Sequence, residues 1–349
     1  MGHRKSRPRK QPPLRQPARA DPNPQPYDPS GLERLPISYQ EITEHFEVAG
    51  EVPLFLLRAE TLRRIEAITR RPLITYVAKT HNIQPDSPAF IDDSDLLGFG
   101  DLVQSTPGHD VDVLLTSNGG SVESTERIVR LIRETYTSVR FIVPANAYSA
   151  ATLMCFAGDS ILLDTLGTLG PIDPQINGIP ARAILRAMES LEERLREQGP
   201  RSLTAYIPML QKMDLYMLEI CKSAQELSKE LATRYLSTYM LREPPDSPRV
   251  KAIVDHFSDY DLHKSHGRSI DRAKCLELGL AIVDLQATPE LRMLVRSLVN
   301  QHELFFDKSP FFKLYENARG INWGRQHFKI QIPVPTAPPV PPSRPAKAN

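Results

Sequence analysis

The sequence predicts an α/β fold in which βαβ units build a mostly parallel sheet and a helical extension follows. Between residues 59 and 164, short β-branched runs alternate with amphipathic helical patterns, as they do in βαβ units with right-handed crossovers. After residue 180 the pattern changes to long helical stretches, and no strong strand follows for a long way. The chain has 349 residues, 40% of them hydrophobic, and can bury a sizeable core.

Strands and helices are expected to alternate through the first half of the chain. The expected strands are PLITYVAK, VDVLLTS, VRFIVP and SILLD, at residues 72–79, 111–117, 139–144 and 160–164. The expected helices cover residues 59–71, 92–105, 121–136 and 149–158. The first of these helices carries apolar residues at helical spacing, and the third opens on Ser121, a residue type favoured at helix starts.

The second half is expected to be helical, between two tails. Helical patterns cover residues 181–198, 213–241, 269–279 and 288–306, with Ser269 as the expected N-cap of the third and a short strand after Gly279. We expect a disordered basic, Pro-rich tail at 1–30, a folded domain at 31–330 with a helical insertion at about 181–245, and a disordered Pro-rich tail at 331–349.

Composition excludes several classes of protein and site. Charged residues make up 24% and nearly cancel, at a net charge of +1, which gives no general attraction to nucleic acid or membrane. The three cysteines are widely spaced, which argues against a disulfide framework and a zinc site, and Cys155 is expected to be a buried, inert thiol. No metal-binding motif or cofactor is expected. Without an apolar run of signal-peptide or membrane-span length, we expect a soluble, cytoplasmic protein.

Two predicted strand ends carry the residues suited to chemistry. Parallel strands bring their carboxyl ends to one edge of the sheet, where ligands bind. The first end continues as TSNGGSVES, and Gly119 and Gly120 there can turn backbone N–H groups outward, as in an oxyanion hole, although a plain tight turn also fits. The second continues as PANAYSAATL, where Ser149 fits either a helix N-cap or a nucleophile.

A third segment, LGPIDPQ, which lies within residues 167–175, adds a carboxylate. Asp173 stands between Ile172 and Pro174, and proline stiffens the loop and fixes its direction. A turn-stabilising aspartate fits this position as well as a catalytic one.

In this order, LLTSNGGSV, VPANAYSAATLMCFAGDSILL and LGPIDPQ resemble the Clp-fold serine peptidases. The most similar branch is the serine dehydrogenase proteinase (SDH) family, a relative of the Clp protease proteolytic subunit and of signal peptide peptidase A. The resemblance covers residues 60–180 and continues more weakly to SHGRSIDRAKCLELGLAIVDL. It implies a ClpP/crotonase-like spiral of βαβ units with a helical C-terminal extension.

The resemblance implies a role for individual residues of this chain. Ser149 matches the nucleophile, and Gly120 and Ala150 match the positions whose N–H groups form the oxyanion hole. The neighbours Gly119 and Ser121 are then expected to contact substrate.

The proton acceptor is less well defined than the nucleophile. The Clp protease subunit places its catalytic histidine where this chain has Asp173, whereas the SDH branch uses serine, aspartate and histidine. The matching histidine is then His266, with His263 as its competitor, although His266 could also merely satisfy loop carbonyls. A Ser–Lys dyad is disfavoured, because no lysine follows GPIDPQ before Lys212.

The resemblance implies a serine endopeptidase that acts on peptides or unfolded proteins and assembles into a homo-oligomer. No phosphate-binding GxxxxGK[ST] motif is present, so any energy-dependent unfolding would need a separate ATPase partner. Two alternatives remain open. One is a non-catalytic Clp-fold scaffold that binds partners through its helices and tails. The other is acyl-CoA chemistry of the crotonase type, which needs no serine at the helix start.

Overall fold

The computed structural model describes residues 28–48, 54–83, 88–199, 203–210 and 215–326; nearly all of both expected tails lies outside this part. Its centre is a seven-stranded sheet in the order β11-β10-β1-β2-β3-β5-β9. The parallel strands are β1 (Leu73–Ala78), β2 (Asp110–Thr116), β3 (Ser138–Val143), β5 (Ser160–Leu163) and β9 (Ile282–Asp284). The antiparallel β10 (Phe311–Asn317) and β11 (Asn322–Gln326) extend one edge. The predicted α/β fold with a mostly parallel sheet is confirmed.

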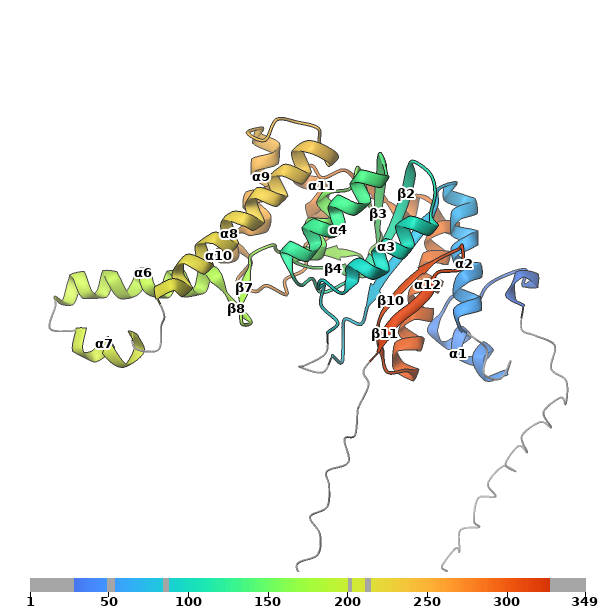
Figure 1. Cartoon of the computed structure of the whole chain (residues 1–349), viewed down its shortest axis with the longest axis horizontal. Coiled ribbons are helices and arrows are strands. Elements are labelled where there is room, and N and C mark those ends of the chain that lie inside the picture. Colours follow the sequence, from blue (N-terminus) through green and yellow to red (C-terminus); the bar gives the residue numbers. More distant parts are fainter. Residues whose placement is uncertain (1–27, 49–53, 84–87, 200–202, 211–214, 327–349) are drawn as a thin grey trace, which may run out of the picture.

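Helices cover both faces of this sheet (Figure 1). α2 (Leu54–Thr69) and α12 (Pro289–Lys308) share one apolar cluster with Leu73 and Val77 of β1. α3 (Asp95–Ser105) and α4 (Val122–Thr135) share the other with Ile74 and Tyr76 of the same strand. Because successive side chains of a strand point to opposite faces, a strand buried on both faces is apolar throughout.

A second, short row of extended segments lies beyond the carboxyl ends of the strands. It contains the parallel pair β4 (Asn146–Ala147) and β6 (Thr168–Leu169), which follow β3 and β5 along the chain. Single bridges extend the row, from Ser117 to Ala147 and from Leu169 to Ile270. A further bridge joins Ile91 to Gly120. The row therefore gathers every segment predicted to carry chemistry.

The hairpin and helices that lie between Gln175 and Tyr235 form an arm. After Asp173 the chain makes the hairpin of β7 (Gln175–Ile176) and β8 (Ile179–Pro180), then α6 (Ala181–Gln198) and α7 (Leu203–Leu210). α6 and α7 project away from the sheet, and α8 (Leu215–Tyr235) leads back to it (Figure 1). The body is completed by α1 (Tyr39–Val48), α5 (Ala150–Phe156), a π-helical turn (Leu236–Met240), α9 (Pro248–Ser258), α10 (Tyr260–His263), α11 (Arg272–Glu277) and short 3₁₀ turns at Pro29–Gly31 and Leu285–Ala287.

Two expectations about the second half are wrong. The N-cap of α11 is Asp271, whose side chain accepts the Lys274 N–H at 2.8 Å, and not Ser269. The hairpin of β10 and β11 was not predicted, because its strands carry lysine, glutamate and arginine among their apolar residues. In the part of the chain that the structure describes, no helix is both long and apolar enough to span a lipid bilayer.

Candidate active site

Ser149 lies in a strained turn between β4 and α5. Its φ of 54° and ψ of −119° are those of the first central residue of a type II′ turn, where glycine is the usual residue. The Ala151 N–H donates to the Tyr148 carbonyl at 3.0 Å and closes this turn. Such strain costs about 1–3 kcal/mol and persists where the surrounding structure holds it, typically at functional sites.

The Ser149 hydroxyl does not cap α5. Among the hydrogen bonds of the described residues, none involves Ser149 Oγ. By contrast, the hydroxyl of Ser121 accepts the Ser124 N–H at 3.0 Å and caps α4. Ser149 therefore stands at the N-cap position of α5, as one interpretation expected, but its hydroxyl makes no capping hydrogen bond. Ser121, expected to contact substrate, already uses its hydroxyl for this cap.

Gly119 allows the chain to pass directly beside Ser149. Its φ is +92°, and a Cβ at this position would lie 2.6 Å from the Tyr148 carbonyl oxygen and 2.8 Å from the Cβ of Ser149. Contacts this short exclude any side chain. Because Gly119 has no side chain, the segment after β2 can pack directly against the turn that contains Ser149.

Gly120 is held from one side by Ile91. The Ile91 N–H donates to the Gly119 carbonyl at 2.8 Å, and its carbonyl accepts the Ser121 N–H, also at 2.8 Å. Ile91 thus bonds to the residues on either side of Gly120. In such a parallel bridge, the N–H of the residue between them, here Gly120, points away from Ile91. A Cβ on Gly120 would lie 2.3 Å from the Ile91 carbonyl oxygen, so only glycine fits.

Two backbone N–H groups near Ser149 have no acceptor. In the described chain, neither the Gly120 N–H nor the Ala150 N–H donates a hydrogen bond. The Ala150 group is free because it opens α5, where the first N–H groups have no partner within the helix. The Gly120 group points away from Ile91, and three residues earlier Ser117 bridges to Ala147 of the segment that leads to Ser149. Two free donors on adjoining segments can stabilise an oxyanion.

Asp173 and His266 form a hydrogen-bonded pair. His266 Nδ1 lies 2.9 Å from Asp173 Oδ1. Asp173 is 1% exposed, whereas the His266 side chain is 19% exposed. A carboxylate only accepts, so we assign the proton of the pair to Nδ1, which leaves Nε2 as a proton acceptor. This is the arrangement of a general base with an orienting carboxylate.

His263 is engaged elsewhere. It is 4% exposed, and its Nε2 lies 2.7 Å from the His256 carbonyl oxygen, to which it donates. Its ring packs edge-on against His256 at 5.0 Å, and burial, aided by the nearby His263, lowers the pKa of His256. The geometry therefore favours His266 over its competitor as the base.

The row of extended segments connects the segments that carry this pair to the serine turn, although no hydrogen bond among the described residues joins Ser149 Oγ to His266 or Asp173. Leu169 pairs with Ala147 in the row, and the Gly170 N–H donates to the Ala147 carbonyl at 3.2 Å. On its other side, Leu169 exchanges two backbone hydrogen bonds with Ile270, at 2.8 and 3.0 Å. Ser149 follows Ala147, Asp173 follows Leu169, and His266 precedes Ile270 by four residues. The three predicted side chains thus come from adjacent segments.

Asp173 is fixed through its neighbour Ile172. The Ile172 N–H donates to the Phe257 carbonyl at 2.8 Å, and its own carbonyl accepts the Ser228 hydroxyl at 2.7 Å. Asp173 Oδ2 is buried and has no hydrogen-bond partner. Ile172 also lines a pocket of about 390 Å³ where the arm meets the body. Its other lining residues are Pro174, Arg182, Gln225, Ser228, Lys229, Asp255, Ser258, Asp259, Tyr260 and Asp261.

The other candidate chemistries find little support in the structure. No group of three or more histidine, cysteine or acidic side chains among the described residues could hold a metal ion. Cys155, Cys221 and Cys275 are free and buried. Burial raises the pKa of Cys155 well above its ordinary value and that of Cys275 to about 12. These thiols stay protonated at neutral pH and are weak nucleophiles.

One element of the site was missed from the sequence. The segment that carries Ile91 holds the Gly119–Ser121 backbone, yet only a helix over residues 92–105 was expected there. Asp95 is in fact fully buried. An aspartate three residues before the first glycine of an apolar helix pattern was the available signal.

Comparison with known proteins assigns a family. A family model described as ClpP-like SDH-type serine proteinase matches residues 52–233, slightly more than half of the chain. Two uncharacterized proteins of Methanocaldococcus jannaschii are similar over shorter stretches. MJ1495 is 27% identical over 129 residues (36% of this chain and 44% of the relative), and MJ0137 is 35% identical over 79 residues (23% and 28%). The chain spans less than half the length of these relatives.

Solved structures with a similar arrangement have low sequence identity. The 1510-N membrane-bound stomatin-specific protease, in complex with a substrate peptide, is 17% identical, with a TM-score of 0.34 over 58% of this chain and 74% of that chain. A ClpP1 mutant from Listeria monocytogenes is 12% identical, with a TM-score of 0.33 over 66% of this chain and 98% of that chain. The family match is the comparison on which the assignment rests.

Proposed function

The chain belongs to the ClpP-like SDH-type serine proteinase family, and on that premise we propose that it is a serine peptidase that cleaves peptide bonds through an acyl-enzyme on Ser149. Its substrates are peptides or unfolded proteins, which can present an extended backbone to the row of segments around the serine. No cofactor takes part.

The reaction uses the groups described above. Ser149 Oγ attacks the peptide carbonyl carbon while its proton passes to His266 Nε2, and Asp173 stabilises the imidazolium that results. The N–H groups of Gly120 and Ala150 bind the oxyanion of the tetrahedral intermediate. His266 then gives the proton to the leaving amine, the C–N bond breaks, and the acyl group remains on Ser149. A water molecule, deprotonated by His266, hydrolyses this ester and restores the enzyme.

The observation that carries the proposal is the state of Ser149. Its hydroxyl has no partner in the described chain, and its backbone adopts a conformation that normally requires glycine. A structural serine would use its hydroxyl for the cap, as Ser121 does. A serine in a strained turn between a strand and a helix is typical of nucleophiles. The His266–Asp173 pair on a neighbouring segment supplies the matching base.

The direct test is hydrolysis of an unfolded protein by the purified full chain. We expect turnover by the wild-type protein and none by Ser149→Ala. Ser247→Ala is the matched control, because Ser247 also precedes a helix but uses its hydroxyl as a cap, away from the site. Equal turnover by Ser149→Ala would contradict the proposal. Absence of turnover in every form, together with tight binding of unfolded protein, would favour the non-catalytic scaffold.

We also propose that the peptidase is a homo-oligomer whose subunits meet through the arm. The described residues of α7 and α8 include the exposed apolar side chains of Leu203, Ile207, Tyr216 and Ile220, whereas α12 packs its apolar face against α2. Light scattering should give a mass that is a multiple of the 39.3 kDa chain, and Ile207→Lys should lower it. A separate ATPase partner is required only for folded substrates, so ATP-independent cleavage of unfolded protein is expected.

A further inference from the structure

Lys313 is a fully buried cation close to the segment that holds Gly120. Its side chain is 0% exposed, although it belongs to β10, next to the edge of the sheet. Its Nζ lies 2.8 and 3.0 Å from the two carboxylate oxygens of Asp95, which is also 0% exposed, and 3.2 Å from Asp92 Oδ2. A buried charge is tolerated only when it is paired and hydrogen-bonded.

The Asp95 carboxylate organises the segment before α3. Besides Lys313, it accepts the Tyr76 hydroxyl at 3.1 Å, the Tyr315 hydroxyl and the Asp92 N–H at 2.9 Å. Burial and the neighbouring Asp95 raise the pKa of both tyrosines, so both stay protonated and donate. Asp95 thus ties the turn that starts at Asp92 to two strands of the sheet.

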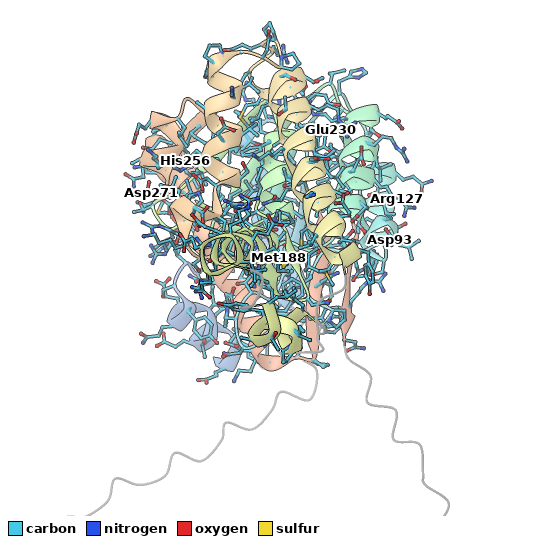
Figure 2. The ribbon with its side chains drawn as sticks, turned by 90° about the vertical axis from the view of Figure 1, so that its left-hand side faces the viewer. Asp93, Arg127, Met188, Glu230, His256 and Asp271 are labelled. Carbon is cyan, nitrogen blue, oxygen red and sulfur yellow. The ribbon has the colours of Figure 1, made fainter. Side chains whose placement is uncertain are left out.

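This turn leads directly into the support of Gly120. Ile91 immediately precedes Asp92, and its N–H and carbonyl form the two 2.8 Å bonds to the backbone around Gly120. A second link runs through Asp93, which accepts the Ser124 hydroxyl at 2.7 Å and pairs with Arg127 at 3.0 Å. Figure 2 shows Asp93 and Arg127 side by side on one flank of the molecule. The turn after Ile91 therefore also fixes the start of α4.

We propose that the Lys313–Asp95 pair positions the Gly120 N–H for oxyanion binding, acting through Asp92 and Ile91. The inference rests on the proposed peptidase function. Lys313 touches no reacting atom, so it is a positioning residue. It also lies outside residues 52–233, the stretch that matches the family. In this proposal, the hairpin of β10 and β11 supports the site as well as extending the sheet.

The same strand supplies a matched control. Glu316 of β10 is also buried, at 2% exposure, and pairs with Arg58 of α2 at 2.7 Å. Side chains at positions 313 and 316 point to opposite faces of the sheet, so this second pair faces α2 and α12 instead of α3. Arg58→Met and Lys313→Met each leave one buried carboxylate without its cation. Only the second disturbs the turn at Asp92.

The experiment measures amide hydrogen exchange and kinetics on the same full-length variants. In Lys313→Met, exchange of the Ile91 and Ser121 amides should rise about tenfold or more, because their bridge loosens. In Arg58→Met, these two amides should stay within about twofold of wild type. Unchanged exchange in Lys313→Met, or an equal rise in both variants, would overturn the inference.

Turnover provides the second measurement. A displaced oxyanion donor weakens transition-state binding only, so Lys313→Met should lower kcat about tenfold or more with KM within about twofold. Arg58→Met should keep both constants near wild type in its folded fraction. Full kcat in Lys313→Met, with Ser149→Ala inactive, would reject the positioning role and leave the peptidase intact. Wild-type turnover in Ser149→Ala would instead reject the function itself, and the positioning role with it.

A double variant tests the inference if Lys313→Met alone does not fold. Lys313→Met with Asp95→Asn removes both charges together, which is far less destabilising than removing one. The asparagine side chain introduced in this way can still accept the Asp92 N–H but has no cation to anchor it. We expect this protein to fold and still to show faster exchange at Ile91 and Ser121. Wild-type exchange and wild-type kcat in the folded double variant would also overturn the inference.

Discussion

Several polar groups around Ser149 lack hydrogen-bond partners, whereas the carboxylates on the two faces of β10 have more than one partner each. Around Ser149, a hydroxyl, two N–H groups and one oxygen of Asp173 have no partner among the described residues. On one face of β10, Asp95 of α3 accepts bonds from four donors, and on the other face Glu316 of β10 is bound by both Arg58 and His302. The carboxylates on the two faces of β10 are buried, whereas Gly120 is exposed and Ser149 and His266 are only partly buried.

This contrast separates groups that act on substrate from groups that hold the protein together. Asp173 Oδ2 is the buried one of these groups, and an unpaired buried polar atom costs about 1–3 kcal/mol. Under the proposed function, the unpaired groups beside the strained serine are left open for a substrate. The carboxylates of Asp95 and Glu316 are each held by a cation, so their effect is on stability and position, although Arg58 Nη1 and His302 Nδ1 beside Glu316 are themselves buried without a partner. Each prediction below substitutes a residue either of the region around Ser149 or of the pairs on β10.

The largest effect is expected from the serine itself. Ser149→Ala and Ser149→Gly should each lower kcat by about 10⁴-fold or more, since the nucleophile is lost. The two variants should differ in stability, because only glycine relieves the strain at φ 54°. Urea unfolding should show Ser149→Gly to be more stable than Ser149→Ala by about 1 kcal/mol. Equal stabilities would mean that the turn is not strained.

The two histidines of the same turn should respond differently. His266→Ala should lower kcat by about 10³-fold or more, with little change in stability, because its ring is partly exposed and Nε2 faces no protein partner. His263→Ala should lower stability by about 1–3 kcal/mol, because it leaves the buried His256 carbonyl unpaired. Its kcat, measured on folded protein, should change little. The reverse result would make His263 the base.

A methyl group on Gly120 tests the support given by Ile91. Gly120→Ala would place a Cβ 2.3 Å from the Ile91 carbonyl oxygen and so force the two segments apart. We expect kcat to fall about 10²-fold, the loss typical of one oxyanion donor. Gly100→Ala is the matched control, since nothing lies within 4 Å of the Cβ it would add. Loss of activity in both proteins would point to a general effect on folding.

The smallest expected effect is a pH dependence of stability on the other face of β10. Burial alone would raise the pKa of Glu316, but Arg58 and His302 outweigh it and lower the pKa from 4.5 to about 2. Protons then favour the unfolded chain, so this contribution is complete above about pH 4.5 and is lost as the pH falls toward 2. Burial lowers the pKa of His302 as well, and its protonation therefore also favours unfolding.

The measurement is the urea midpoint between pH 7 and pH 3. The midpoint of wild type should fall more steeply than that of Glu316→Gln below about pH 4.5. Parallel curves would show that Glu316 does not carry this dependence.

The strands of the sheet and the candidate serine could be predicted from the sequence, but the contacts that hold them in place could not. Strands β1, β2, β3 and β5 could be placed because each is a short apolar run, and the first three alternate with helical patterns. Gly119 and Gly120 stood out because their pairing suggests positive φ, which both have. The strain at Ser149 could not be seen, because serine is common in ordinary turns and caps.

The supporting contacts depend on residues far apart in the chain. Lys313 and Asp95 are 218 positions apart, and a lysine within FFKLYEN gives no hint of its partner. Ile91 is joined to Gly120 by a single bridge, which is too short to leave a strand pattern. His266 and His263 could not be separated either, because only packing shows which of them meets Asp173.

Covalent labelling with a fluorophosphonate tests the central claim most directly. This reagent traps a serine only when the hydroxyl is activated by a base and its oxyanion is stabilised, so labelling reports the nucleophile, His266 and the N–H groups together. We predict one adduct per chain, located on Ser149 by peptide mass spectrometry and lost in His266→Ala but not in His263→Ala. Labelling at another residue, or equal labelling in Ser149→Ala, would contradict the account.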